Sequence, residues 1–281
     1  MDEASTRVPV AGVAMTAIGV AVIRARESAR TDRLYDDPLA QWFVDAAREG
    51  FTAERWERVD ALSGQFYEGR TVGVRLVDDR VREAVGQGIR QIVLIGAGLD
   101  TRAFRMEWPA QTRIFEVDLP ETFGFKEPVL RKAEARPRCE RQVVAVDLRD
   151  EWAETLIAQG FRVDQPTLWV DEGVLGYLSA EEALRAAAII TELSAPGSNF
   201  GAGRFTTEVN SGRYAELHRL VSGDDAPPRL PGGLGPDIEV WFDENGWSTE
   251  FFGWDDLVAA IDRPEAAVHD PGVGFIRAVR R

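Results

Sequence analysis

The sequence predicts an α/β fold built around an open, mostly parallel sheet, and two observations lead to this prediction. The first is a short apolar run, Gln91–Ile95, that breaks into the glycine turn Gly96-Ala97-Gly98. A run that is apolar at nearly every position fits a strand buried on both faces, as parallel strands are. The second is a series of similar runs farther along the chain, each of which ends at an acidic residue. Strands that alternate with helices in this way are typical of α/β folds.

Length and composition limit the classes of protein that fit. With 281 residues and 44% hydrophobic content, the chain is long enough for one large domain, and no second domain is required. The formal net charge of -14 argues against nucleic acid and against an anionic membrane surface as partners. A single cysteine, Cys139, excludes an internal disulfide and a cysteine-based zinc site, and two histidines leave little for any metal. We therefore expect a cytoplasmic protein without a metal.

Residues 1–88 are predicted to form an N-terminal helical cap. The expected helices span residues 14–29, a stretch opened by Pro38 that runs through Trp42 and Phe43, residues 52–62 and residues 69–85. The apolar stretch 8–23 resembles a signal peptide, but arginines follow it without a convincing cleavage site. It is also shorter than the roughly 20 residues that a membrane span needs. A buried helix is the interpretation that fits.

Residues 89–200 are predicted to hold the core of the sheet. The expected strands span residues 91–95, 113–117, 143–146, 167–170 and 199–205. Ser179 and Glu182 have the spacing of a capping box, which predicts a helix from there through Leu193. Three consecutive strands close with an acid, at Asp118, at Asp147 and at Asp171-Glu172. In this architecture ligands bind at the carboxyl ends of the strands, so these acids indicate a binding site.

The glycine turn allows a ligand to approach the backbone closely. The dinucleotide fingerprint needs a third glycine where Thr101 stands, so GAGLDT departs from it. Asp118 lies at about the distance expected for an acid that binds ribose hydroxyls, and Glu116 is the second choice because both lie on one side of the strand. This pattern separates NAD, FAD and S-adenosylmethionine poorly. A tight turn without a ligand also fits it.

The remaining chain is predicted to contain an insertion and the last strands. Residues 201–236 are irregular and rich in turns, with a helix over 211–221 that brings Tyr214 and His218 onto one face. A lid over the substrate and an ordinary long surface loop both fit this insertion. In residues 237–281 we expect a helix over 237–245, a strand from Gly246-Trp247, a helix over 255–261 and a final strand over 273–279.

Several segments occur in an order and at spacings typical of one family. They are GAGLDTRAFRM, FEVDLPETFGFK, VVAVDLRD, TLWVDEGVLGYLSAEEA and LSAPGS. Together they resemble the leucine carboxyl methyltransferase superfamily, from about Ala14 to Ser198 and weakly again at residues 245–247. The resemblance implies a Rossmann-like class I methyltransferase fold: a seven-stranded, mostly parallel sheet with an antiparallel last strand, a helical cap and a lid insertion after strand five. It also implies S-adenosyl-L-methionine as the cofactor.

The resemblance assigns parts of the cofactor to individual residues. Arg70, within RTVGV, matches the arginine that binds the methionine carboxylate, and a guanidinium offers a planar fork of donors that suits a carboxylate. Arg26 matches a basic position that contacts the cofactor in relatives with lysine there. Gly96 and Gly98 give the close backbone approach.

The acids at the strand ends match the rest of the cofactor. By the same resemblance, Asp118 holds the ribose hydroxyls, and Glu172 lies near the sulfonium and amino acid part. Asp147 accepts from the adenine amino group while Leu148 packs on the ring. The other interpretation of each aspartate is a helix N-cap, which favours Asp at the same place.

The residues for the methyl acceptor are less defined. Tyr177 matches a tyrosine that lines the active site of relatives, where it orients the acceptor or simply packs; His218 is a candidate base or a bystander. A carboxylate acceptor needs no base, whereas a phenol, with a pKa of about 10, benefits from one. We expect an O-methyltransferase that acts on a carboxylate or hydroxyl of a small molecule, with secondary metabolism as one setting. Methylation of a protein or peptide C-terminal carboxylate, and cofactor binding without methylation, stay open.

Overall fold

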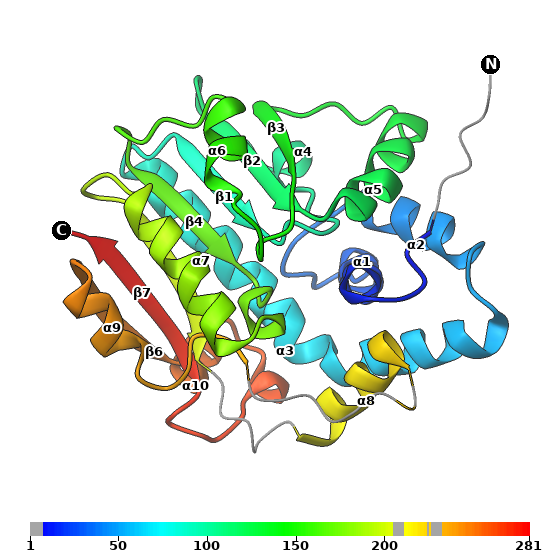
Figure 1. The fold of residues 1–281 in the computed structure, drawn as a ribbon. Coiled ribbons are helices and arrows are strands. Elements are labelled where there is room, and N and C mark those ends of the chain that lie inside the picture. The colour runs from blue at the N-terminus through cyan, green and yellow to red at the C-terminus, as the bar shows by residue number, and fades with distance from the viewer. Residues whose placement is uncertain (1–7, 205–210, 224, 226–231) are drawn as a thin grey trace.

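A computed structural model describes residues 8–204, 211–223, 225 and 232–281. Within these residues seven strands form one sheet in the order β3-β2-β1-β4-β5-β7-β6 (Figure 1). The strands are β1 (Gln91–Ile95), β2 (Arg113–Asp118), β3 (Glu140–Ala145), β4 (Thr167–Asp171), β5 (Asn199–Arg204), β6 (Trp247–Gly253) and β7 (Gly274–Arg280). β7 pairs antiparallel with β5 and with β6, and the other pairs are parallel. The predicted seven-stranded, mostly parallel sheet with an antiparallel last strand is confirmed.

Helices cover both faces of this sheet (Figure 1). They are α1 (Thr16–Ser28), α2 (Ala40–Arg48), α3 (Ala53–Gly86), α4 (Arg102–Arg105), α5 (Pro120–Lys132), α6 (Ala153–Ala158), α7 (Ala180–Glu192), α8 (Ser211–Ser222), α9 (Ile238–Glu244) and α10 (Trp254–Ala259). Short 3₁₀ turns lie at η1 (Val13–Met15), η2 (Leu175–Tyr177) and η3 (Pro264–Ala266). None of the helices in the described ranges combines the length and the apolar content that a bilayer crossing needs.

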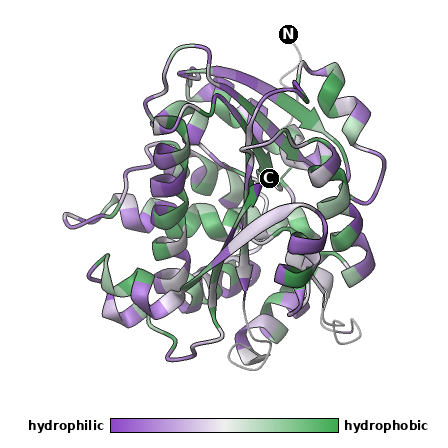
Figure 2. Cartoon of the chain, turned by 90° about the vertical axis from the view of Figure 1, so that its left-hand side faces the viewer, coloured by the Kyte–Doolittle hydropathy of each residue, from purple (hydrophilic) through white to green (hydrophobic). Residues whose placement is uncertain are grey.

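The central strand explains why the core lies on both faces of the sheet. All five residues of β1 are buried. Ile92 and Leu94 pack into one apolar cluster with α1, α3 and α5, whereas Val93 and Ile95 pack into another with α7 and α9. Because successive side chains of a strand point to opposite faces, an unbroken apolar run is what a strand covered on both sides requires. Figure 2 shows this hydrophobic interior along the strands.

The predicted boundary between two cap helices at residues 62–69 is wrong, because α3 runs without interruption from Ala53 to Gly86. Two small residues, Ser63 and Gly64, lie where α3 packs against α1. The Ser63 hydroxyl donates to the Gly19 carbonyl at 3.3 Å, and a Cβ on Gly64 would lie 3.6 Å from the Arg26 guanidinium. The small side chains thus permit close helix packing and do not end the helix.

The predicted third strand also starts too late, because β3 begins at Glu140 and not at Val143. β3 is an edge strand of the sheet, and its first three residues are polar. Polar and charged residues are common on edge strands, where one side of the strand has no neighbour. A prediction that searches for apolar runs misses such a start.

Candidate active site

The glycine turn at the end of β1 is closely packed by two other segments. Gly96 has φ +65° and Gly98 has φ +50°, in the left-handed region that glycine adopts most readily. A Cβ on Gly96 would overlap the side chain of Val174, in the loop after β4, and a Cβ on Gly98 would lie 3.1 Å from that of Ala17 in α1. The two glycines therefore permit a close approach of protein as well as of any ligand.

Asp118, at the end of β2, is bound to this turn. One carboxylate oxygen accepts a hydrogen bond from the Gly98 amide at 2.6 Å. The other accepts from the Leu119 amide and from the Thr122 hydroxyl, each at 2.7 Å. Burial raises the pKa of Asp118, while these donors act to lower it. The structure therefore brings the predicted ribose-binding acid against the predicted glycine turn.

Glu116, the second candidate for the ribose, is committed elsewhere. Its side chain is fully buried, and one of its oxygens binds the Lys126 ammonium at 2.6 Å. The Arg141 guanidinium donates to both carboxylate oxygens, at 2.8 and 2.7 Å. A carboxylate closed in by two cations inside the fold is not placed to hold a ribose, so the structure contradicts this alternative.

Asp147 and Leu148 follow β3 and lie beside the end of β2. The Val146 amide donates to the Asp118 carbonyl at 2.9 Å, which joins the two strand ends. Asp147 forms a bidentate ion pair with Arg149, and the Arg149 hydrogen bonds lower the pKa of Asp147. Leu148 is 8% exposed and packs with the apolar cluster on the α7 side. In this arrangement the carboxylate predicted to accept from adenine already has a charged partner.

Arg70 and Glu172 lie in contact at the end of β4. The Arg70 guanidinium donates from Nη1 to the Glu172 carbonyl at 2.8 Å, and it passes 3.9 Å from where a Cβ of Gly173 would stand. The Glu172 carboxylate forms an ion pair with Arg102 of α4. The structure therefore places a guanidinium and a carboxylate together at the carboxyl edge of the sheet.

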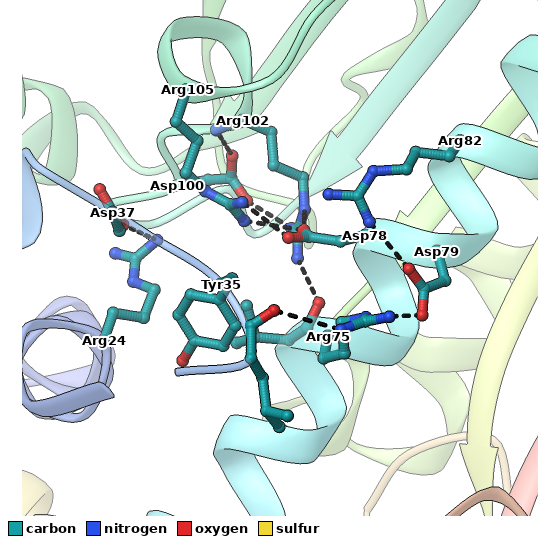
Figure 3. A network of polar contacts seen from close by, with 12 residues as sticks. Arg24, Tyr35, Asp37, Arg75, Asp78, Asp79, Arg82, Asp100, Arg102 and Arg105 are labelled. Carbon is teal, nitrogen blue, oxygen red and sulfur yellow. Dashed lines mark hydrogen bonds and ion pairs between the residues drawn. The ribbon is translucent and has the colours of Figure 1, made fainter. Parts of the chain in front are cut away.

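Sequence reasoning missed a buried ion network of Asp78, Asp100, Arg102 and Arg105 (Figure 3). Glu172 also binds to this network, through Arg102. Arg102 is 1% exposed, and its guanidinium binds Asp78 of α3 at 2.7 Å, Asp100 at 2.5 Å and Glu172. Arg105 binds both oxygens of Asp78, at 2.6 and 2.7 Å. The network thus connects α3, the loop after the glycine turn, α4 and the end of β4.

The charges in this network depend on one another. Burial acts to raise the pKa of Asp78, but Arg102 and Arg105 lower it to about 2. A buried carboxylate is tolerated only with such partners, because removal of a charge from water is costly. A signal existed in the sequence, since GAGLDTRAFRM holds an acid and two arginines within six residues. The partner Asp78, on a helix with many charges, could not be recognised from spacing alone.

The other three predicted site residues are Arg26, Tyr177 and His218. Arg26 forms an ion pair with Asp60 of α3 at 2.6 Å, on a side chain that is 36% exposed, and this contact is not with the glycine turn. Tyr177 ends η2, in the loop that begins with Glu172. His218 lies on α8, where Nδ1 is 3.4 Å from the Ser222 hydroxyl. All three assignments stay predictions.

The insertion after β5 is attached at two places. The α8 helix lies along the cap (Figure 1), where the Leu220 carbonyl accepts from Arg55 at 3.0 Å. Beyond α8, the amide of Gly233 donates to the Leu178 carbonyl at 3.1 Å, next to Tyr177. Residues 205–210, 224 and 226–231 of the predicted lid lie outside the described residues. The described parts join the cap to the loop that carries Tyr177.

Asp171, the last residue of β4, holds that loop in place. Its Oδ1 atom accepts from three successive backbone amides, those of Gly173, Val174 and Leu175. Burial raises the pKa of this carboxyl group to about 6, although the three amides act to lower it. The loop with Glu172 and Tyr177 is therefore folded around a carboxylate that is costly to ionise.

Replacement of Asp171 by Asn should stabilise the protein more at about pH 7.5 than at about pH 5. With a pKa raised from 3.8 to about 6, the native state binds the proton more tightly than the unfolded state. The stability that this provides is complete below the unfolded pKa and is lost as pH rises through about 6. Asn keeps the acceptor oxygen and carries no charge. Between the two pH values we expect the difference in unfolding free energy between variant and wild type to grow by about 1–2 kcal/mol.

Urea unfolding at the two pH values measures this difference. Asp147→Asn is the matched control, because Arg149 lowers the pKa of Asp147 and the group stays ionised throughout this window. Its effect on stability should not change between about pH 5 and about pH 7.5. An equally flat result for Asp171→Asn would contradict the raised pKa.

In the described part of the chain, no cluster of His, Cys, Asp and Glu side chains is suited to hold a metal ion. The charged groups at the sheet edge are thus carboxylates and guanidinium groups from the ends of β2, β3 and β4 and from α3 and α4. Such groups can recognise hydroxyl, amino, carboxylate and ammonium groups of a ligand.

Comparisons with known proteins identify the family of this chain. The sequence model of the leucine carboxyl methyltransferase family matches residues 17–191. A candidate S-adenosyl-L-methionine-dependent methyltransferase of Parafrankia sp. (strain EAN1pec) is 40% identical over 279 residues, which cover 96% of this chain and 88% of the relative. Another from Frankia alni is 38% identical over 287 residues and covers 100% and 99% of the two chains.

Solved structures confirm the predicted class I methyltransferase fold. A candidate methyltransferase from Thermobifida fusca YX has a TM-score of 0.55 at 20% identity and covers 94% of both chains. A DUF574 family protein from Streptomyces avermitilis has a TM-score of 0.54 at 17% identity and covers 93% of this chain and 97% of its own. At this level of identity the likeness concerns the fold alone. The family match and the relatives, which extend over nearly the whole chain, go further: this protein belongs to the leucine carboxyl methyltransferase family.

Proposed function

We propose that this protein transfers a methyl group from S-adenosyl-L-methionine to a carboxylate or hydroxyl oxygen of a small molecule. It is a methyltransferase that uses S-adenosyl-L-methionine, as its family and its relatives are. The observation that supports the site is the meeting of four groups at one edge of the sheet: the glycine turn, Asp118 bound to it, Glu172 and Arg70.

The charged groups at this edge fit the parts of the cofactor. Asp118 keeps acceptor capacity for ribose hydroxyls, because a carboxylate has about four acceptor sites and three hydrogen bonds are formed in the structure. Arg70 spends one N–H on the Glu172 carbonyl and suits a carboxylate with the others. Glu172 suits an ammonium group, and Asp147 suits the adenine amino group, with Leu148 as the apolar contact.

The chain's part in methyl transfer is mainly orientation. When bound, S-adenosyl-L-methionine supplies a methyl group already activated on a positively charged sulfur. The residues must align the acceptor oxygen behind that methyl, at roughly 3–3.5 Å. Since charge is neutralised as the methyl moves, fixed dipoles and the exclusion of water contribute more than an acid would. The loop with Glu172 and Tyr177, which Asp171 holds, and the insertion attached to it suit the orientation of the acceptor and the exclusion of water.

The acceptor is a small molecule in this proposal because of the insertion. Its two attached ends, at the cap and at the loop with Tyr177, favour a covered site over the open groove that a protein C-terminus needs. A carboxylate acceptor requires no base. For a hydroxyl acceptor, Tyr177 and His218 are the candidates to orient or deprotonate it.

Titration calorimetry with S-adenosylhomocysteine, with NADH as the control, tests the cofactor site. We expect binding near the micromolar range and none with NADH. Turnover with methyl-labelled cofactor then separates the acceptors, because methyl esters lose the label in alkali and aryl methyl ethers keep it. No labelled product from a panel of small carboxylates and phenols, together with labelling of a peptide C-terminus, would contradict the small-molecule proposal.

Arg70→Ala should weaken S-adenosylhomocysteine binding by about 1.5–3 kcal/mol, which is roughly 10-fold to 150-fold in Kd. The reason is the loss of hydrogen bonds between a guanidinium and the carboxylate of the ligand. Arg75→Ala is the matched control on the same helix, since Arg75 forms a surface ion pair with Asp79. Wild-type affinity in Arg70→Ala, with an unchanged circular dichroism spectrum, would remove Arg70 from the site.

A further inference from the structure

A second cavity lies between α3 and the face of β4, β5 and β7. Its empty volume is about 520 Å³, open mouth included. The apolar walls come from Val77, Val81 and Ala84 of α3, Leu168 and Val170 of β4, and Phe275 of β7. The polar lining consists of Arg80 and Glu83 of α3, Gln87 just after α3, Asp171 at the end of β4 and Arg277 of β7. A largely apolar cavity with a few charged groups is the usual form of a small-molecule site.

Arg80 is a cation in this cavity without a direct ion pair, although Glu172 and Glu83 act on it at longer range. Within the described residues no carboxylate oxygen lies within 4.0 Å of its guanidinium, and it forms no hydrogen bond. Burial lowers its pKa to about 9. Its neighbours on α3 differ, since Arg75 and Arg82 both pair with Asp79 at 2.8 Å. An arginine that is largely removed from water and forms no direct ion pair is unusual, because desolvated charges are normally paired.

The position of Arg80 is fixed by an aromatic ring. The carbon of its guanidinium lies over the ring of Phe275, a cation–π contact. That ring lies over Gly201 of β5, where any Cβ would overlap it. A contact with a ring face uses no N–H group as a hydrogen-bond donor to an oxygen, so the Arg80 donors remain available to an anion.

A second unpaired donor lies at the same cavity. The Nη atoms of Arg277 bind Glu250 at 2.6 Å and Glu83 at 3.5 Å. Its Nε atom is buried and has no hydrogen-bond partner. Buried donors are rarely left unsatisfied, because each costs about 1–3 kcal/mol. Two arginines with unused donors in one apolar cavity indicate an anionic ligand.

We propose that this cavity binds a small apolar molecule with one carboxylate, held by Arg80 and covered by the walls of α3, β4 and β7. Arg80 is distinct from the predicted methionine-binding arginine, since Arg70 precedes it by ten residues, or roughly 15 Å along the helix, and the cavity reaches the predicted cofactor site only at Asp171, next to Glu172. The proposal does not depend on the methyl acceptor, and it adds a second ligand to a protein with one known cofactor.

Calorimetric titration with hexanoate, with hexanamide as the neutral control of the same shape, tests this site. We expect hexanoate to bind at least about tenfold more tightly than hexanamide, because only the anion pairs with the guanidinium. Arg80→Met should lose at least about tenfold in hexanoate affinity. Arg82→Met is the matched control, since Arg82 is 55% exposed and pairs with Asp79, and its affinity should equal that of the wild type.

Two further measurements keep the proposal testable if Arg80→Met does not fold. Ala84→Met fills the cavity and leaves Arg80 in place, so it should also weaken hexanoate binding if Arg80→Met fails to fold. Saturation with S-adenosylhomocysteine should leave hexanoate binding unchanged, since the proposal assigns the two carboxylates to different arginines, Arg70 and Arg80. Equal affinity for acid and amide, unchanged binding in both cavity variants, or displacement by S-adenosylhomocysteine would each overturn the proposal.

Discussion

Arg102→Met is expected to lower the free energy of unfolding by about 3–5 kcal/mol, which is the usual cost of removing one partner from a buried ion pair. Arg102 contacts Asp78, Asp100 and Glu172, and Arg105 can compensate only the first of them. The variant therefore leaves Asp100 buried without its main cation. Burial acts to raise the pKa of Asp100, and Arg102 is the first of the charges that lower it.

Urea unfolding followed by circular dichroism measures this effect, and Arg82→Met is the matched control. Arg82 forms an exposed i,i+3 ion pair with Asp79, so its loss should cost less than about 1 kcal/mol. If Arg102→Met unfolds at the urea concentration of the wild type, the network does not hold α3 and α4 to the end of β4. Where the variant stays folded, S-adenosylhomocysteine should also bind more weakly, because Glu172 has lost its partner.

Asp118→Ala is expected to weaken S-adenosylhomocysteine binding by roughly 10-fold to 150-fold. The carboxylate has about one acceptor site left beside its three internal hydrogen bonds, so one hydrogen bond from a ribose hydroxyl, of about 1.5–3 kcal/mol, is lost. The Gly98 amide also loses its acceptor, so the glycine turn loses a contact that fixes it. Adenosine should show a similar loss, because it carries the same ribose.

Thr122→Val separates the ligand role of Asp118 from its structural role. This variant removes one internal hydrogen bond of the carboxylate and keeps the charge and the Gly98 contact. Its affinity for S-adenosylhomocysteine should fall less than about tenfold. A defect in Asp118→Ala that spares adenosine would place the ribose elsewhere.

The sheet could be predicted from the sequence wherever a strand is buried on both faces. Gln91–Ile95 is apolar from Ile92 onward, is buried at every position, and begins and ends where predicted. The edge strand β3 was predicted only in its apolar half, since its polar start carries no such signal. Helix α3 was predicted as two helices, over residues 52–62 and 69–85, whereas in the fold Ser63 and Gly64 between them continue the helix and provide room for α1.

The site could be predicted where local spacing fixes the geometry. Between the glycine turn and Asp118 lie the short helix α4, a loop and the strand β2, and the parallel pairing of β1 with β2 brings Asp118 to Gly98. Contacts between distant segments were not accessible in the same way. Neither the Arg102 network nor the Asp60 partner of Arg26 has a periodic signal, because each depends on how α3 lies against the rest of the fold.

The order of the strands also has a consequence for how the chain folds during synthesis. β7 is formed by residues 274–280, yet it lies between β5 and β6, and within the described chain β6 pairs with β7 alone. The β5-β7-β6 side of the sheet thus cannot form until the last strand has been synthesised, whereas β1 to β4 can pair much earlier. Until then, the Phe200 and Trp247 positions lack the Ile276 and Ala278 side chains of their common cluster. During synthesis this apolar surface therefore stays exposed until β7 has been made. Until then the surface is available to chaperones and to aggregation.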